Sequence, residues 1–100
     1  GERPIILSEF GGIAVAGEGG WGYSSAARPE ELLAAYERLI GALHRCRGIA
    51  GYCYTQLCDT FQEKNGLATM ARRPKGEATR IAEATRGKRK AVAMDVDPEA

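Results

Sequence analysis

Two strand-like runs on either side of one amphipathic helix constrain the fold of this chain more than any other feature. Residues 4–12 hold the continuous apolar stretch Ile5-Ile6-Leu7 and end at paired glycines, a pattern typical of a strand that is buried on both faces. Residues 48–57 are rich in aromatic and β-branched side chains, as strands are. With a helix between them, the two strands are expected to run parallel in one sheet. The sequence therefore predicts an α/β fold.

The helix between the strands has clear signals at both ends. Pro29 suits a first helical turn, and the acidic Glu30 and Glu31 face the positive end of the helix dipole. Apolar side chains then recur at helical spacing, at Leu32, Leu33, Tyr36, Leu39, Ile40 and Leu43. Basic side chains follow, and Gly48 ends the helix. We assign His44, which lies among these basic residues, to the helix end and not to a ligand or base role.

Polar side chains follow both strands at the point where each strand ends. Glu9 closes the first apolar run, and Tyr54, Thr55 and Gln56 close the second, with Asp59 just beyond. Parallel strands present their carboxyl ends at one rim, which is where α/β barrels place catalytic side chains. We therefore expect these residues to share a rim. A strand-end glutamate can also point into water with no role, and spacing alone leaves both interpretations open.

The connection between the first strand and the helix, residues 11–28, is long and rich in glycine. It carries Trp21 and Tyr23, which either anchor the loop as a hydrophobic plug or form an aromatic platform beside Glu9. Residues 17–22 match G-x-G-x-x-G. Because several residues separate this match from the helix, we do not expect a dinucleotide site.

Composition excludes several classes of protein. The 100 residues suffice for one small domain or a piece of a larger one, and a net charge of +1 indicates no particular partner. No apolar run reaches the roughly 18 residues of a membrane span, and no signal peptide opens the chain, so we expect a cytoplasmic protein without a membrane partner. Cys46, Cys53 and Cys58 match no zinc or redox spacing. We expect buried free thiols, no metal site and no cofactor.

The C-terminal part changes character. Residues 76–85 can form a final helix, but its apolar side is thin, so it must pack on something larger. Residues 86–100 lack periodicity and are predicted to be a disordered tail. A short basic run such as 86–90 can act as a nuclear address or a nucleic-acid arm, but we favour a solvated tail, which is the commoner role of such a run. We expect no nucleic-acid partner.

Short stretches in two parts of the chain, in register, resemble glycoside hydrolase family 2, the β-galactosidase and β-glucuronidase family. Residues 6–12 (Ile-Leu-Ser-Glu-Phe-Gly-Gly) resemble its nucleophile strand. Residues 54–59 and 62–67, followed by Arg-Arg-Pro-Lys at 72–75, resemble its last barrel strand and the loop after it. The family fold is a (β/α)8 TIM barrel, usually preceded by β-sandwich domains. The resemblance implies that residues 1–85 are the C-terminal fragment of such a barrel, from strand seven to helix eight, and that the rest lies outside this chain.

The resemblance also implies a chemistry. Glu9 would be the nucleophile of a retaining β-glycosidase, which forms a covalent glycosyl-enzyme that water then hydrolyses. Trp21, Tyr54 and Gln56 would be candidate contacts to the carbohydrate substrate, by stacking and hydrogen bonding. In this family the acid/base glutamate comes from an Asn-Glu pair on an earlier strand, and no such pair occurs here. The fragment alone is therefore expected to be inactive.

Departures from the family pattern bear on the substrate. The glucuronidase branch carries an Asn-x-Lys pair that binds the sugar carboxylate, whereas this chain has Glu63, Lys64 and Asn65 at the corresponding positions. A neutral sugar such as a galactoside is therefore expected. Cys58 stands where the family has Thr, and Ala71 stands where it has an acid. A different function also remains open, namely a non-catalytic carbohydrate-binding or interaction fragment that keeps the rim without the acid/base.

Overall fold

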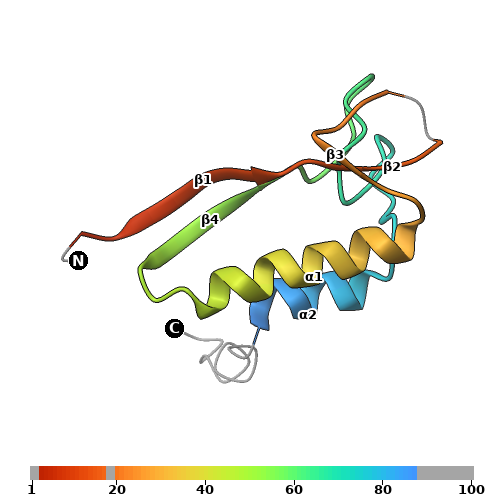
Figure 1. The fold of residues 1–100 in the computed structure, drawn as a ribbon. Helices are drawn as coiled ribbons and strands as arrows, with labels where there is room; N and C mark the ends of the chain where they lie inside the picture. Colours follow the sequence, from red (N-terminus) through yellow and green to blue (C-terminus); the bar gives the residue numbers. More distant parts are fainter. Residues whose placement is uncertain (1–2, 18–19, 88–100) are drawn as a thin grey trace, which may run out of the picture.

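The structure, a computed structural model, describes residues 3–17 and 20–87. Two parallel strands lie side by side, with two helices packed together on one side of them (Figure 1). The described elements, in chain order, are β1 (Ile5–Gly11), β2 (Ile13–Val15), β3 (Ser24–Ala26), α1 (Pro29–Arg45), β4 (Ile49–Thr55) and α2 (Ala78–Arg86). The fold is thus a small mixed α/β arrangement. Most of the predicted tail, residues 88–100, lies outside the described residues.

The predicted parallel pairing of the strands at residues 4–12 and 48–57 is confirmed. β1 pairs with β4 in parallel, with Phe10 opposite Tyr54 and Gly11 opposite Thr55 at their carboxyl ends. The helix between them is also confirmed, with Pro29 in its first turn and buried apolar side chains along one face. Both strands therefore end at the same edge of the sheet.

The prediction that the first apolar run is buried on both faces was wrong. Ile5 and Ile6 are 56% and 67% exposed. Within the described residues β1 has no strand neighbour except β4. The core contacts the sheet near the carboxyl ends of the strands. There Phe10, Tyr52 and Tyr54 pack on a buried cluster, which consists of Tyr36, Ile40 and Leu67. The early residues of β1 lie beyond this cover.

The cysteines are free, but the expectation that they are buried was also wrong. Cys46 and Cys53 are exposed, and Cys58 is half-buried. Cys53 lies between Tyr52 and Tyr54, whose rings pack toward the helices. Since neighbouring side chains in a strand point to opposite faces, the Cys53 thiol lies on the uncovered face of β4.

The glycine-rich connection contains two short strands that the sequence interpretation missed. β2 and β3 pair in parallel, and Ile13, Val15 and Ala26 form a buried cluster with Leu32 of α1. The signal was present, because Ile13 and Val15 are β-branched residues in an otherwise glycine-rich segment. The connection is therefore a packed layer over the start of α1.

Side-chain contacts hold α2 against α1, although α2 has no fully buried residue. Ile81 and Ala84 pack on the cluster around Tyr36 and Ile40. This confirms the prediction that the narrow apolar side of the last helix packs on a larger element. Arg80 donates two hydrogen bonds to the Glu37 carboxylate, at 2.8 and 3.1 Å, and this contact lowers the pKa of Glu37. The Tyr36 and Thr85 hydroxyls lie 2.7 Å apart.

Gly11 should not tolerate a side chain. Its φ is +103°, and a Cβ atom there would overlap the ring of Tyr54. We expect Gly11→Ala to lower the free energy of unfolding by about 2–4 kcal/mol, because backbone strain and overpacking add. Urea unfolding followed by circular dichroism measures this loss.

Gly51→Ala is the matched control, since a Cβ at Gly51 meets no atom within 4 Å. Its stability should be equal to or slightly above that of the unaltered chain. Equal stability of both variants would show that Tyr54 does not pack against Gly11 in solution.

Candidate functional site

A shallow hollow lies at the carboxyl ends of the two parallel strands. Glu9, Phe10 and Gly11 of β1 line it together with Thr55 of β4 and Tyr23, and its volume is about 380 Å³. The structure thus brings Glu9 to the end of the second strand, as the parallel pairing required. Glu9 is exposed. Among residues 3–17 and 20–87 its carboxylate forms no hydrogen bond or ion pair, so its oxygens are open to solvent or a ligand.

Aromatic packing fixes the end of the strand that carries Glu9. The ring of Phe10 meets Tyr52 and Tyr54 edge-on, with centroids 5.7 and 5.3 Å apart. Because this packing holds Phe10 toward the helices, the adjacent Glu9 is directed to the other side of β1. A rigid strand end is a more accurate support for a reacting group than a loop.

Trp21 and Tyr23 form an exposed aromatic pair next to the hollow. Their rings meet edge-on at 5.5 Å, and they are 46% and 67% exposed. Two backbone hydrogen bonds of 2.7 Å attach Trp21 to the loop after β4, from its amide to the Gln62 carbonyl and from the Lys64 amide to its own carbonyl. The backbone of Trp21 therefore anchors the loop, whereas its half-exposed indole stays accessible and does not form a buried hydrophobic plug.

Tyr54 is turned into the protein and not toward the hollow. Its ring packs edge-on against Tyr36, with centroids 4.9 Å apart, and its buried hydroxyl has no hydrogen-bond partner. Burial raises the pKa of Tyr54 to about 12. The nearby Tyr36 adds to this rise, and the Ile13 backbone acts in the opposite direction. The sequence interpretation expected Tyr54 to contact a sugar. In this conformation its hydroxyl is buried and does not reach the hollow.

Tyr54→Phe should therefore be harmless at neutral pH. Because the lost hydroxyl is buried without a partner, the unfolding free energy at pH 7 should stay level or rise by up to about 1 kcal/mol. The raised pKa favours the folded state below pH 10, and this contribution is lost as the pH rises through about 12.

Denaturant titrations at pH 7, 10 and 12 test both points. The loss of stability between pH 10 and 12 should be smaller in Tyr54→Phe than in the unaltered chain. Tyr23→Phe, which alters an exposed residue, should leave stability at pH 7 unchanged. A clear loss of stability at pH 7 in Tyr54→Phe would mean that the hydroxyl has a partner.

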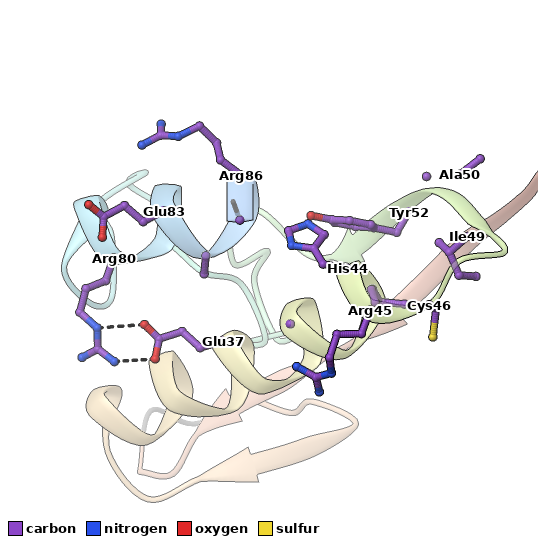
Figure 2. A pocket seen from close by; sticks show the side chains of 15 residues that line it. Glu37, His44, Arg45, Cys46, Ile49, Ala50, Tyr52, Arg80, Glu83 and Arg86 are labelled. Atoms are coloured by element: carbon purple, nitrogen blue, oxygen red, sulfur yellow. Dashed lines mark hydrogen bonds and ion pairs between the residues drawn. The ribbon is translucent and has the colours of Figure 1, made fainter. Parts of the chain in front are cut away.

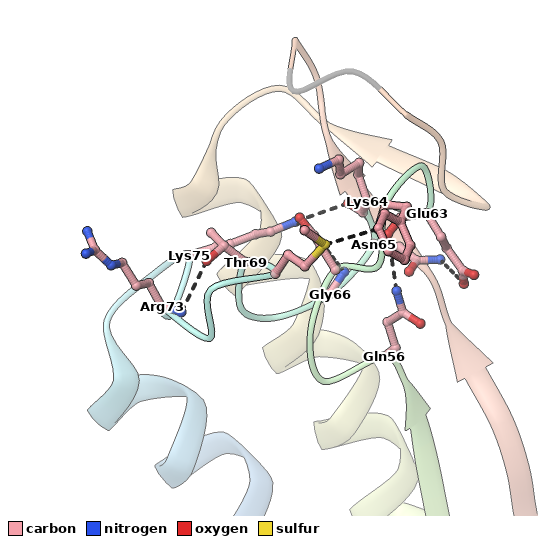
Figure 3. A network of polar contacts seen from close by, with 11 residues as sticks. Gln56, Glu63, Lys64, Asn65, Gly66, Thr69, Arg73 and Lys75 are labelled. Carbon is pink, nitrogen blue, oxygen red and sulfur yellow. Dashed lines mark hydrogen bonds and ion pairs between the residues drawn. The ribbon is translucent and has the colours of Figure 1, made fainter.

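Gln56 supports the loop after β4 and does not line the hollow. Its side-chain amide donates to the Glu63 carbonyl at 3.3 Å, and its backbone carbonyl accepts from the Leu67 amide at 3.0 Å. Figure 3 shows Gln56 reaching from the end of β4 toward Glu63. Of the predicted sugar contacts, only Trp21 thus presents an accessible side chain close to Glu9's hollow.

Asp59 is buried in an ion pair and is not on the rim, contrary to the expectation from its place in the sequence. Its Oδ1 lies 2.9 Å from Lys75 Nζ, and the two side chains are 5% and 2% exposed. The same oxygen accepts a hydrogen bond from the Gly66 amide at 2.8 Å. No local pattern links Asp59 to Lys75, so the sequence interpretation missed this pair.

A larger hollow of about 750 Å³ lies at the other end of β4, between the two helices. Figure 2 shows His44 beside Tyr52 there, with the Glu37–Arg80 pair further along. The position of His44 at the end of α1 is confirmed. In the part of the chain that the structure describes, no group of three or more His, Cys, Asp or Glu side chains could hold a metal ion.

No protein-family model and no curated protein matches the chain. Neither described helix combines the length and the apolar character needed to cross a membrane.

Proposed function

We propose that this chain carries the catalytic nucleophile of a retaining β-glycosidase, within a (β/α)8 barrel completed by residues outside the chain. The observation that supports this most is the meeting of Glu9, Tyr23 and Thr55 around one hollow at the carboxyl ends of two parallel strands. Barrel enzymes use this end of the sheet for catalysis. The resemblance of the surrounding motifs to glycoside hydrolase family 2 gives Glu9 its role.

The proposed reaction uses Glu9 as an oxygen nucleophile. Its carboxylate attacks the anomeric carbon while the glycosidic bond breaks, and the resulting glycosyl ester is hydrolysed by water, so the anomeric configuration is retained. An exposed carboxylate without partners within the described residues is free to approach a sugar. The leaving oxygen takes its proton from a second carboxyl group about 5–5.5 Å away. Glu9 is the only acidic residue that lines the hollow among the described residues, so we assign the acid/base to another part of the barrel.

The aromatic pair suits a sugar substrate. Sugar rings have apolar faces that stack on indole and phenol rings. Tyr23 lines the hollow and Trp21 meets it edge-on, so a sugar bonded at Glu9 has an aromatic surface within reach. The nearby loop carries Glu63, whose carboxylate accepts a hydrogen bond from Asn65. This negative charge supports a neutral galactoside over a uronic acid.

A slow mechanism-based substrate tests the proposal. An activated 2-deoxy-2-fluoro-β-galactoside should trap the glycosyl ester in the enzyme that contains this chain, because the fluorine slows hydrolysis of the intermediate. Peptide mass spectrometry should then find the sugar on the peptide that contains Glu9. A label on another carboxylate would contradict the assignment.

A non-catalytic sugar-binding role is the second candidate, and the absence of a second carboxylate around the described hollow favours it. It predicts that the fluorosugar binds reversibly and leaves no covalent label, while intrinsic fluorescence of Trp21 still changes on binding. Labelling and fluorescence measured on the same sample separate the two candidates.

A further inference from the structure

A continuous series of polar contacts connects the buried ion pair to the backbone of Trp21. Lys75 Nζ lies 2.9 Å from Asp59 Oδ1 and donates to the Lys64 carbonyl at 3.1 Å. Lys64 donates its own amide to the Trp21 carbonyl at 2.7 Å, and the Trp21 amide donates to the Gln62 carbonyl. Figure 3 shows the Lys75 side chain extended across the loop toward Lys64. Asp59 and Trp21, far apart in the sequence, thus belong to one network.

The backbone next to Trp21 packs closely against residues 62–64 of the loop after β4, which leaves little room for either segment to shift. Gly20 has a φ of +70°, and a Cβ atom there would overlap the Gln62 carbonyl oxygen and the Lys64 side chain. Any displacement of the loop backbone at residues 62–64 must therefore move the segment that carries Trp21.

The ammonium group is suited to fix this loop. The Lys75 side chain is 2% exposed, and hydrogen bonds from a charged donor are shorter and stronger than neutral ones, above all away from water. The Asp59 carboxylate balances the charge of the Lys75 ammonium group and accepts a hydrogen bond from the Gly66 amide. The first, middle and last parts of the loop from Asp59 to Lys75 are thus held together at one carboxylate. The Lys64 carbonyl is thus held by a donor that has little freedom to move.

We propose that Lys75 is a positioning residue for the indole of Trp21. Its buried ammonium group holds the Lys64 carbonyl, the Lys64 amide holds Trp21, and the indole is thereby kept against Tyr23 at the edge of the hollow. The identity of the ligand as a sugar rests on the proposed function. The positioning itself does not, and it can be measured without any sugar.

The double variant Asp59→Asn with Lys75→Met, made in the full chain, separates positioning from folding. Asn keeps an oxygen for the Gly66 amide, and Met fills the space of the lysine stem, so no buried charge is left without a partner. Replacing a buried pair in this way is often tolerated. The Lys64 carbonyl loses its donor. Trp21 is the only tryptophan in the chain, so fluorescence reports on its surroundings alone.

We expect the double variant to keep the far-ultraviolet circular dichroism of the unaltered chain, while the Trp21 emission shifts to the red and acrylamide quenches it more strongly. Arg73→Met is the matched control, because it removes an exposed cation from the same loop and should leave the emission unchanged. An unchanged emission in a folded double variant would overturn the proposal.

Hydrogen exchange in the unaltered chain provides a second test if the double variant does not fold. The amides of Trp21 and Lys64 should exchange as slowly as that of Leu67, which donates to the Gln56 carbonyl within the same loop. Fast exchange at Trp21 and Lys64 alone would show that the network does not hold Trp21, and would overturn the proposal.

Kinetics distinguish this inference from the proposed function. In the enzyme that contains the chain, the double variant should raise KM for an aryl galactoside about threefold to tenfold, as expected for a weakened stacking contact, with kcat unchanged. If the proposed function fails, the fluorosugar will not label Glu9 even in the unaltered enzyme, whereas the red shift caused by the double variant will remain.

Discussion

Glu9→Gln should lower kcat for an aryl β-galactoside by about 10⁴-fold or more in the enzyme that we propose contains this chain, while the galactoside still binds. An amide has nearly the shape of the carboxylate but cannot attack the anomeric carbon to form an ester. The substitution leaves the described fold intact, because the Glu9 side chain is exposed and makes no hydrogen bond or ion pair to any described residue. Steady-state kinetics gives kcat, and isothermal titration with a competitive inhibitor gives Kd.

Glu83→Gln is the matched control, since it removes an exposed carboxylate from α2, away from the hollow. Its kcat should equal that of the unaltered enzyme. Added azide offers a further check on the role of Glu9. In Glu9→Ala it can take the place of the missing carboxylate and give a glycosyl azide of inverted configuration. A Glu9→Gln enzyme that keeps kcat within a few-fold of the original would end the assignment.

Asp59→Asn alone should lower the free energy of unfolding by about 3–5 kcal/mol, because it leaves the Lys75 ammonium group buried without its counter-charge. Such a loss is a large share of the stability of a small domain. The loss should be partly restored by adding Lys75→Met, since the double variant contains no buried charge. Urea unfolding of the single and double variants measures the coupling between the two sites.

The exposed ion pair between the helices is the control for this prediction. Glu37→Gln removes the partner of Arg80, and both side chains are about two-fifths exposed, at 39% and 42%. Exposed pairs contribute little, so its effect should be much smaller than that of Asp59→Asn. Because the pKa of Glu37 is lowered in the folded chain, its small contribution is present at neutral pH and is lost as the pH falls through the folded pKa. Equal effects of both substitutions would show that Asp59 is exposed to water in solution.

The fold was largely predictable where short-range patterns decide it. The spacing of Leu32, Leu33, Tyr36 and Ile40 determined α1, and the strand–helix–strand order determined the parallel pairing of β1 with β4. The exposure of Ile5 and Ile6 was not predictable from the apolar pattern, because that pattern shows which side chains suit a core and not whether neighbouring elements cover them. β2 and β3 were missed because the surrounding glycines conceal a three-residue strand signal.

The candidate site was predictable only in its outline. The position of Glu9 at a strand end follows from the chain order, and the structure places Thr55 beside it. The inward orientation of Tyr54 depends on the space left by the missing side chain of Gly11 and on edge-on packing against Tyr36, and no local sequence pattern contains either contact. The pairing of Asp59 with Lys75 depends on how the loop folds back on itself, which a local sequence pattern does not determine.

The uncovered first part of β1 has a practical consequence for handling this protein. Within the described residues its outer edge is unpaired, and Ile5 and Ile6 are exposed next to it. An open edge of this kind is a template for strand addition by another molecule. We therefore expect the isolated chain to associate more as its concentration rises, so dilute storage should preserve it better than concentrated storage.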